Sequence, residues 1–421
     1  MENKIQLKSG GIKQQSFEFI FIFYLAFSIL SYSFFALYIP STNIIAMLSF
    51  GMLFLRELFF NKLNYKTLLS VFVVICFVGL IWFSNNSQIT NPLIALLIFS
   101  ICARDLNYHR ILRVAYYVIM TMLFVIILSS QLGIITDYVA NQFGRVRHFL
   151  GFQYALYPGN LVLELMLISI YLSKGIKSKI FLIIVDFVIF YYTDSRLAFG
   201  LTLISLFLCS EFFIKIVRKI AGIRIFRLFL SSIYVFFTMV SLWISMIYVD
   251  SVGWLYELNR LLNYRLELCR RAISVYGITL FGKPVNFTGA AVNANGINVS
   301  AGMDYFTVDN GYLDLLIKYG IIAEVIYLAF ITYLLYTLLR TENYKLYIIY
   351  FIMGVHLLID FSMLNLIYNV FILLMFYRKD AISILVCNHK KRVKHRVRIV
   401  LCNKKGNKEI SYENLSRNYK I

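Results

Sequence analysis

The stretch VAYYVIMTMLFVIILSSQL, residues 114–132, decides the fold class of this protein. It carries no charged side chain, and as an α-helix it would be about 28 Å long at 1.5 Å per residue. That length matches the roughly 30 Å hydrocarbon thickness of a bilayer. Similar runs recur along most of the chain, so we predict a bundle of about twelve membrane-spanning helices. The predicted spans are residues 17–38, 41–55, 67–84, 90–103, 114–132, 158–173, 180–194, 196–214, 228–249, 311–339, 346–361 and 363–377.

Composition points to the same class. The 421 residues are 60% hydrophobic and only 15% charged, with a mean hydropathy of +0.74. We therefore predict an all-α polytopic membrane protein, because helices satisfy their backbone polar groups inside lipid. The first apolar run is too long for a cleaved signal peptide. Of the six cysteines only Cys269 falls in an outward loop, so we expect no disulfide, and no CxxC pair indicates a metal site.

Lysine and arginine residues concentrate in alternate connections between the predicted spans. Because positive residues mark the cytoplasmic side, an even number of spans places both termini in the cytoplasm. The net charge of +20 then reflects topology and not nucleic-acid binding. The predicted regions are a cytoplasmic segment 1–15, a helical bundle 16–377 with extracytoplasmic loops 133–157 and 250–310, and a basic cytoplasmic tail 378–421.

Arginines also fall on the outward side, where the positive-inside rule predicts few. In the first long outward loop, Arg145 and Arg147 lie beside His148. They could snorkel to lipid phosphates, or form a clamp for a diphosphate, because guanidinium presents a planar fork of donors. Arg196 lies in the next outward turn. It either forms a surface pair with Asp194 or points into the bundle as a fixed cation.

The later outward loop begins with residues 254–276, whose apolar side chains recur at helical spacing. We predict one amphipathic helix here, which leaves Arg265 and Arg270 without a local carboxylate. These arginines either lie at headgroup depth on a membrane-bound helix or meet a lipid diphosphate there. The stretch from Val285 to Gly302 is rich in Asn, Gly and Ala and is expected to form a flexible lid. Two ion pairs are expected on the polar face of the helix: Glu257–Arg260 and Glu267–Arg271.

Residues 309–312 close this loop and open the next predicted span. Asp309 could cap that helix with its carboxylate. Alternatively, Asp309 and Tyr312 are three residues apart, would share a helix face, and could line a cavity at the outer end of the bundle.

Polar residues also occur within the predicted spans. His356 and Asp360 are four residues apart and share one face of a predicted helix, and we interpret them as residues that form a helix-packing hydrogen bond. Glu164 lies in another span and is expected to have a polar partner, because an isolated carboxylate is costly in lipid.

Together these segments resemble the bacterial polysaccharide polymerases of the Wzy type, within the O-antigen polymerase and ligase superfamily. The similarity covers most of residues 15–377, and it rests on the order and placement of short motifs. One departure is that the histidine which many members carry before the Pro and Asn of the first motif is absent from residues 153–157. The motifs are Arg147 with Leu150-Gly151-Phe152, Pro158 and Asn160; Thr193 with Ser195-Arg196; Arg265 with Tyr276-Gly277 and Phe281-Gly282; and Asp309-Asn310-Gly311-Tyr312-Leu313 with Tyr319-Gly320-Ile321-Ile322.

The resemblance implies an enzyme on the outer face of the bacterial cytoplasmic membrane. Such enzymes transfer a growing glycan from undecaprenyl diphosphate to the non-reducing end of a new lipid-linked repeat unit. It also implies the metal-independent integral-membrane glycosyltransferase (GT-C) fold, and work beside a flippase and a chain-length regulator in the bilayer. The chain has no DxD motif, so we expect no metal or other cofactor, and arginines must neutralise the departing diphosphate.

Each candidate site residue then has an expected role. Asp309 is the first choice for the base that deprotonates the acceptor hydroxyl and His148 the second, since a carboxyl near the membrane gains from a raised pKa. The other expected roles are diphosphate binding by Arg147, Arg196 and Arg265, and substrate binding by Asn310, Tyr312, Arg270 and Arg145.

Two other functions remain open from the sequence. An O-antigen-ligase-type enzyme of the same superfamily would differ only in the acceptor of the glycan. A lipid-linked-oligosaccharide flippase or a solute transporter would also suit about twelve spans, although transporters often show two related halves.

Overall fold

A computed structural model describes four long stretches of the chain and seven single positions between residues 72 and 84. The stretches are residues 2–60, 91–142, 145–298 and 303–376. Most of the predicted span 67–84, the predicted connection 85–90 and the basic tail 378–421 lie outside the described residues.

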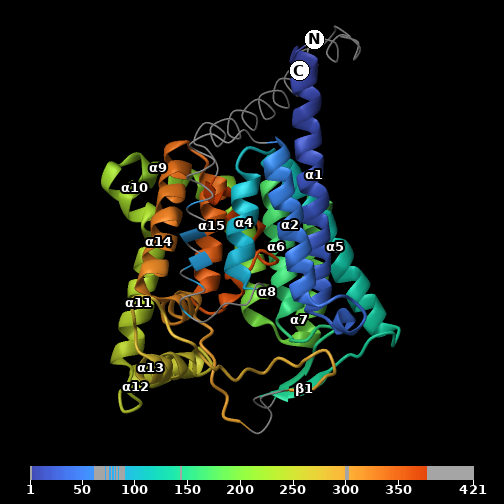
Figure 1. The fold of residues 1–421 in the computed structure, drawn as a ribbon. Helices are drawn as coiled ribbons and strands as arrows, with labels where there is room; N and C mark the ends of the chain where they lie inside the picture. The colour runs from blue at the N-terminus through green and yellow to red at the C-terminus, as the bar shows by residue number, and fades with distance from the viewer. Residues whose placement is uncertain are drawn as a thin grey trace, which may run out of the picture. The chain divides into compact units, whose positions relative to one another are not determined.

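The described residues are mostly helical (Figure 1). Within the part of the chain that the structure describes, four helices are long and apolar enough to cross a membrane, or six if each of two bent pairs counts as one span. This agrees with an all-α membrane protein. The four are the Gly11–Ser31 part of α1 (Glu2–Ser31), α2 (Thr42–Phe60), α5 (Tyr108–Gln131) and α14 (Gly311–Arg340); the bent pairs are α8 (Arg196–Leu208) with α9 (Glu211–Gly222), and α10 (Arg224–Ser231) with α11 (Ile233–Ile247).

Shorter helices and one small sheet complete the described part. The sheet is an addition to the predicted all-α fold. These elements are η1 (Phe34–Leu37), α4 (Pro92–Ala103), β1 (Val139–Gln142), β2 (Arg145–His148), α6 (Tyr157–Tyr171), α7 (Ile176–Thr193), α12 (Gly253–Leu261), α13 (Arg265–Tyr276), α15 (Tyr344–Leu357), η2 (Phe361–Leu364) and η3 (Val370–Phe376).

Polar side chains set several helix starts. The side chain of Asn91 accepts from the amide of Leu93, with Pro92 at the first helical position of α4. Asn107 caps α5 and Ser210 caps α9 in the same way. These caps fix where each apolar helix enters the bundle.

Four predicted helices differ from the structure. The predicted span 363–377 forms 3-10 turns, because the side chains of Asn365 and Asn369 bond local backbone groups and compete with an α-helix. The predicted spans 196–214 and 228–249 are broken by bends of 74° and 57°. The predicted single helix 254–276 is two helices, α12 and α13, as shown below.

The polar loops predicted to face outward lie at one end of the helical bundle. Figure 1 shows β1, α12, α13 and the orange loop before α14 together at the lower end, while α9 and α10 lie at the upper end. The two loops touch, since the amide of Val292 donates to the carbonyl of Gln153 (2.9 Å). The shared placement is the arrangement that the alternation of basic connections predicts.

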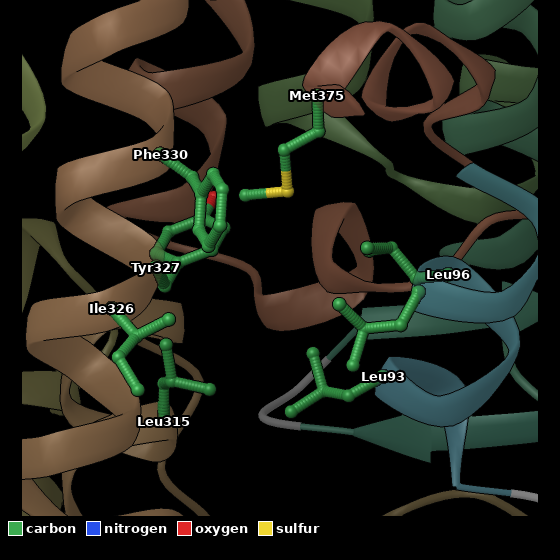
Figure 2. A pocket seen from close by; sticks show the side chains of 8 residues that line it. Leu93, Leu96, Leu315, Ile326, Tyr327, Phe330 and Met375 are labelled. Carbon is green, nitrogen blue, oxygen red and sulfur yellow. The ribbon is translucent and has the colours of Figure 1, made fainter. Parts of the chain in front are cut away.

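Inside the bundle, Glu164 is fully buried, and one of its carboxylate oxygens accepts from the amide of Val370 (2.9 Å). The expected polar partner is therefore a backbone group. An apolar pocket lies between α4 and α14 (Figure 2), and its described lining contains no charged side chain. It is lined by Leu93, Leu96, Leu97, Leu315, Ile326, Tyr327, Phe330 and Met375.

Candidate anion-binding site

The first cluster of arginines gathers around Asp194, the residue that follows the last residue of α7. In the β1–β2 hairpin, alternate residues face the same side, so Arg145 and Arg147 point together. Arg145 lies 3.2 Å from one carboxylate oxygen of Asp194, and Arg147 donates to the Asp194 backbone carbonyl (3.3 Å). Arg196 bonds the other carboxylate oxygen of Asp194 (2.8 Å). Asp194 therefore contacts three guanidinium groups, two through its carboxylate and one through its backbone carbonyl.

These three arginines differ in exposure. The Arg196 side chain is 63% exposed, which fits the surface-pair interpretation and not a cation pointing into the bundle. Arg147 is half-buried, and its Nε is buried with no hydrogen-bond partner among the described residues. Burial lowers the pKa of Arg147, although Tyr154 and Asp194 oppose this. Arg147 thus has a donor directed at nothing within the described protein, which suits an incoming anion.

The second cluster centres on an ion pair between the two halves of the later loop. The Nε of Arg265 lies 2.7 Å from a carboxylate oxygen of Asp309, and the two side chains are 19% and 14% exposed. Arg265 begins α13 because Asn263 and Tyr264 adopt positive φ angles of 53° and 64° and break the predicted helix. The pair joins residues 44 positions apart, so Arg265 has a carboxylate, though not a local one.

Asp309 is not the helix cap. That role belongs to Asn310, whose side chain accepts from the amides of Tyr312 and Leu313. Burial raises the pKa of the Asp309 carboxyl, with Arg265 opposing and Asp360 adding to the rise. Burial lowers the pKa of Arg265, but the nearby Asp309 carboxylate raises it, and the net pKa is raised. The Asp309 carboxylate therefore forms no helix-capping hydrogen bond and lies beside the Arg265 guanidinium.

The charge of a second carboxylate, that of Asp360, acts on the ion pair of Arg265 and Asp309. The sequence did not predict this interaction. Asp360 lies beyond the end of α15, and its carboxylate accepts from the amide of Ser362 (2.8 Å) and from the side chain of Asn160 (3.0 Å). His356 bonds the other end of the same Asn160 amide (3.2 Å). The expected helix-packing hydrogen bond is therefore confirmed, with Asn160 of α6 as the partner of both residues.

Two tyrosines connect the clusters, and the sequence interpretation did not single them out. The charges of Asp309 and Arg265 act on both Tyr154 and Tyr305, and the charge of Arg147 also acts on Tyr305. Burial raises the pKa of both hydroxyls, so they remain protonated donors. Because Tyr154 follows the hairpin and Tyr305 precedes Asp309, only the fold brings them together.

Other predicted residues lie elsewhere or are engaged in packing. His148 bonds Asp137 (2.7 Å) and packs its ring edge-on against Tyr192, and no described contact joins it to Asp309. Arg270 is exposed on α13 and forms no ion pair with a described residue.

The two residues expected to orient sugar are built into the bundle. The side-chain amide of Asn310 donates to Ser241 and to the carbonyl of Leu358, both at 2.9 Å. Tyr312 is fully buried and donates to the carbonyl of Gly354 (3.0 Å). These contacts favour a structural role for both.

The ion pairs predicted on the two loop helices have different outcomes. Glu257 and Arg260 form the expected contact (2.7 Å). Arg271 lies 3.9 Å from Asp304, and the structure records no ion pair between it and Glu267. Arg271 also lies over the ring of Phe306 (4.6 Å).

The later loop is fastened to the bundle before the stretch from Val285 to Gly302, whose role as a flexible lid stays a prediction. Thr288 and Phe306 form an antiparallel bridge, and Tyr276 stacks on Phe306. Where α14 kinks at Gly320 (φ 84°), the amide of Ile321 donates to the loop carbonyl of Thr279 (3.0 Å). Of the predicted lid, residues 299–302 lie outside the described residues.

Two glycines make this docking possible. A Cβ on Gly320 would collide with the backbone of Gly282 and Leu280, and one on Gly282 would collide with the backbone of Lys318. Both glycines have positive φ, which few other residues adopt. Two of the motifs that carry the resemblance therefore contact each other directly.

The arrangement offers anion-binding donors, a carboxyl with a raised pKa and protonated hydroxyls at the loop end of an apolar bundle. Among the described residues, no group of three His, Cys, Asp or Glu side chains could hold a metal ion. In comparisons with known proteins, the chain matches no family model, no curated protein and no solved structure.

Proposed function

We propose that this protein is a polysaccharide repeat-unit polymerase. It transfers a growing glycan from undecaprenyl diphosphate to the non-reducing end of a new lipid-linked repeat unit. The observation that carries this proposal is the juxtaposition of Arg147, Arg265 and Asp309 with two tyrosines at the end of an apolar bundle. A substrate with a diphosphate at membrane depth and a sugar hydroxyl to activate needs this set of groups.

The proposed reaction uses the residues in distinct ways. Asp309 accepts the proton of the acceptor hydroxyl, whose oxygen forms the new bond to the anomeric carbon of the growing chain. The bond between that carbon and the diphosphate oxygen breaks, and its electron pair leaves with the diphosphate. Arg147 and Arg265 neutralise the departing charge, which grows in the transition state.

The incoming diphosphate would bind one donor that has no partner and share another that now bonds Asp309. The free Nε of Arg147 can bond a phosphate oxygen without losing a contact. Arg265 would share its donors between the phosphate and Asp309, which would weaken the ion pair and free Asp309 to act as a base. Arg145 and Arg196 supply further positive charge around Asp194.

The full architecture in this proposal has about twelve spans and a fold similar to the metal-independent integral-membrane glycosyltransferases. Both termini lie in the cytoplasm, and the site faces outward from the bacterial cytoplasmic membrane. The grouping of both polar loops at one end supports this topology (Figure 1). A flippase that supplies substrate and a chain-length regulator are the expected partners.

A deletion strain tests the function. We expect deletion to leave single repeat units on lipid, and the wild-type gene to restore a ladder of long chains on a gel. Long polymer that is merely unattached would identify a ligase instead. Lipid-linked units trapped on the cytoplasmic face would identify a flippase.

A further inference from the structure

The corner formed by α9 and α10 has three kinds of surface. On α9, the buried residues Ile214, Val217 and Ala221 recur at helical spacing and pack on the protein. Exposed apolar residues form a second stripe, and basic residues form a third. The second stripe is Phe212, Ile216 and Ile220, and the third is Lys215, Arg218 and Lys219. A helix with apolar and basic stripes side by side suits the plane between hydrocarbon and water.

The apolar stripe continues onto the neighbouring spans. Phe229 of α10 is 52% exposed and contacts Phe236 of α11, which is itself 47% exposed. At the other side, Phe207 of α8 contacts Phe213 of α9. Because α8 and α11 present apolar side chains on their outer surfaces, the lipid that covers them reaches the corner.

The corner has a defined shape. Arg227 donates from its Nε to the carbonyl of Ala221 (2.8 Å) and from an Nη to that of Gly222 (3.4 Å), which closes the end of α9. Ser210 caps the start of α9 through the amide of Phe213. Hydrogen bonds at both ends of α9 therefore fix the position of the helix that carries the basic residues.

The basic residues of the corner form no ion pairs with described carboxylates. Lys215, Lys219 and Arg224 are exposed, and no described carboxylate forms an ion pair with them. Arg218 is also exposed and lies over the ring of Tyr344 (5.7 Å). A row of unpaired cations at headgroup depth attracts anionic phosphate groups.

We propose that the α9–α10 corner is an interfacial elbow that binds the headgroups of anionic phospholipids through Lys215, Arg218, Lys219 and Arg224. The exposed apolar stripe enters the hydrocarbon, and the basic stripe holds the phosphates above it.

The test measures binding of phosphatidylglycerol and phosphatidylcholine to the full-length protein in detergent by native mass spectrometry. The elbow variant carries K215Q, R218Q, K219Q and R224Q. A matched control carries R113Q, K177Q, K179Q and K283Q, four basic residues outside the corner that form no ion pair with a described residue. We expect the elbow variant to bind phosphatidylglycerol at least about tenfold more weakly, since each basic residue near an anionic surface contributes roughly fivefold.

Phosphatidylcholine binding should be the same for all three proteins, and the control should retain its preference for phosphatidylglycerol. Single substitutions in the elbow should each give part of the loss. Unchanged phosphatidylglycerol binding by the elbow variant would overturn the proposal and leave the basic row to an acidic protein partner. An equal loss in the control would also overturn it, because the effect would then be one of net charge.

Discussion

The loop end of the bundle and the α9–α10 corner both carry clusters of basic residues, but they hold them differently. At the loop end, Arg265 is mostly buried against Asp309, and the Nε of Arg147 is buried without a partner. At the corner, Lys215 and Lys219 are exposed and unpaired among the described residues. A buried cation must be held by a specific arrangement of partners, whereas an exposed one is hydrated wherever it stands.

The comparison shows that burial and pairing, and not charge alone, separate a candidate site from a surface. Substitutions at the loop end should change a specific reaction and its supporting fold. Substitutions at the corner should change only the binding of anionic phospholipids.

The greatest loss of stability should come from Gly320→Ala, because its Cβ would collide with the loop backbone at the kink of α14. We expect a loss of at least about 3 kcal/mol in the free energy of unfolding. Thermal unfolding in detergent measures it. The matched control at the corner is Gly222→Ala, whose Cβ would meet nothing within 4 Å. Equal melting temperatures for the two variants would show that the loop is not docked as described.

Arg265→Ala and Arg147→Ala should each reduce polymer formation by about a hundredfold, the usual effect of removing a group that stabilises developing charge. Polymer is measured on a gel in the complemented deletion strain, with protein level as the reference. Arg265→Lys should retain part of the activity, since it keeps the charge and loses the fork of donors. Normal chain length in either alanine variant would break the assignment.

Asp309→Asn should abolish elongation if Asp309 is the base, with little change in stability. Loss of the ion pair with Arg265 is destabilising, but the raised pKa of Asp309 means that its charge also opposes folding, so the two contributions offset each other. Thermal unfolding and the polymer assay together separate the two effects. Asp360→Asn is the comparison variant, because its carboxylate is occupied by Ser362 and Asn160. Full elongation by a folded Asp309→Asn protein would exclude Asp309 as the base.

Polymer formation should fall as the external pH is lowered through the raised pKa of Asp309, because the protonated carboxyl cannot accept a proton. Stability should change in the opposite direction. A raised pKa means that the protonated carboxyl favours the folded state, and this contribution is lost as pH rises through that pKa. The melting temperature of the wild type should therefore fall relative to Asp309→Asn with rising pH. A constant difference across the range would contradict the raised pKa.

The smallest effect should come from the ion pair between Glu257 and Arg260, whose side chains are 54% and 61% exposed. Glu257→Gln should cost less than about 0.5 kcal/mol, because water and salt screen exposed pairs. This pair lies in the same loop as Arg265 and Asp309. A cost comparable with that of Arg265→Ala, which leaves the Asp309 carboxylate without its cation, would mean that burial does not distinguish the two pairs.

The sequence could predict the apolar bundle, the two polar loops and most of the charged residues of the candidate site. It could not predict their partners, since Arg265 bonds Asp309 across 44 positions and Asn160 bonds Asp360 across 200. Such contacts depend on how helices pack, which local spacing does not encode.

The predictions of local backbone structure were wrong for a different reason. The break at Asn263 and Tyr264 and the 3-10 turns near Asn369 depend on single backbone angles and side-chain hydrogen bonds. Helical periodicity continues through the first break, so it does not reveal it. Tyr154 and Tyr305 carried no pattern at all in the sequence, because only the convergence of both loops gives them a shared site.

Binding of undecaprenyl diphosphate to the purified protein in phosphatidylcholine nanodiscs tests whether the loop end holds the lipid diphosphate. We expect saturable binding by the wild type and binding at least about tenfold weaker by Arg147→Ala and by Arg265→Ala, since a charged hydrogen bond contributes about 1.5–3 kcal/mol. The elbow variant should bind as the wild type does. If instead the elbow variant loses the lipid diphosphate and the two loop-end variants retain it, the site has been placed at the wrong end of the molecule.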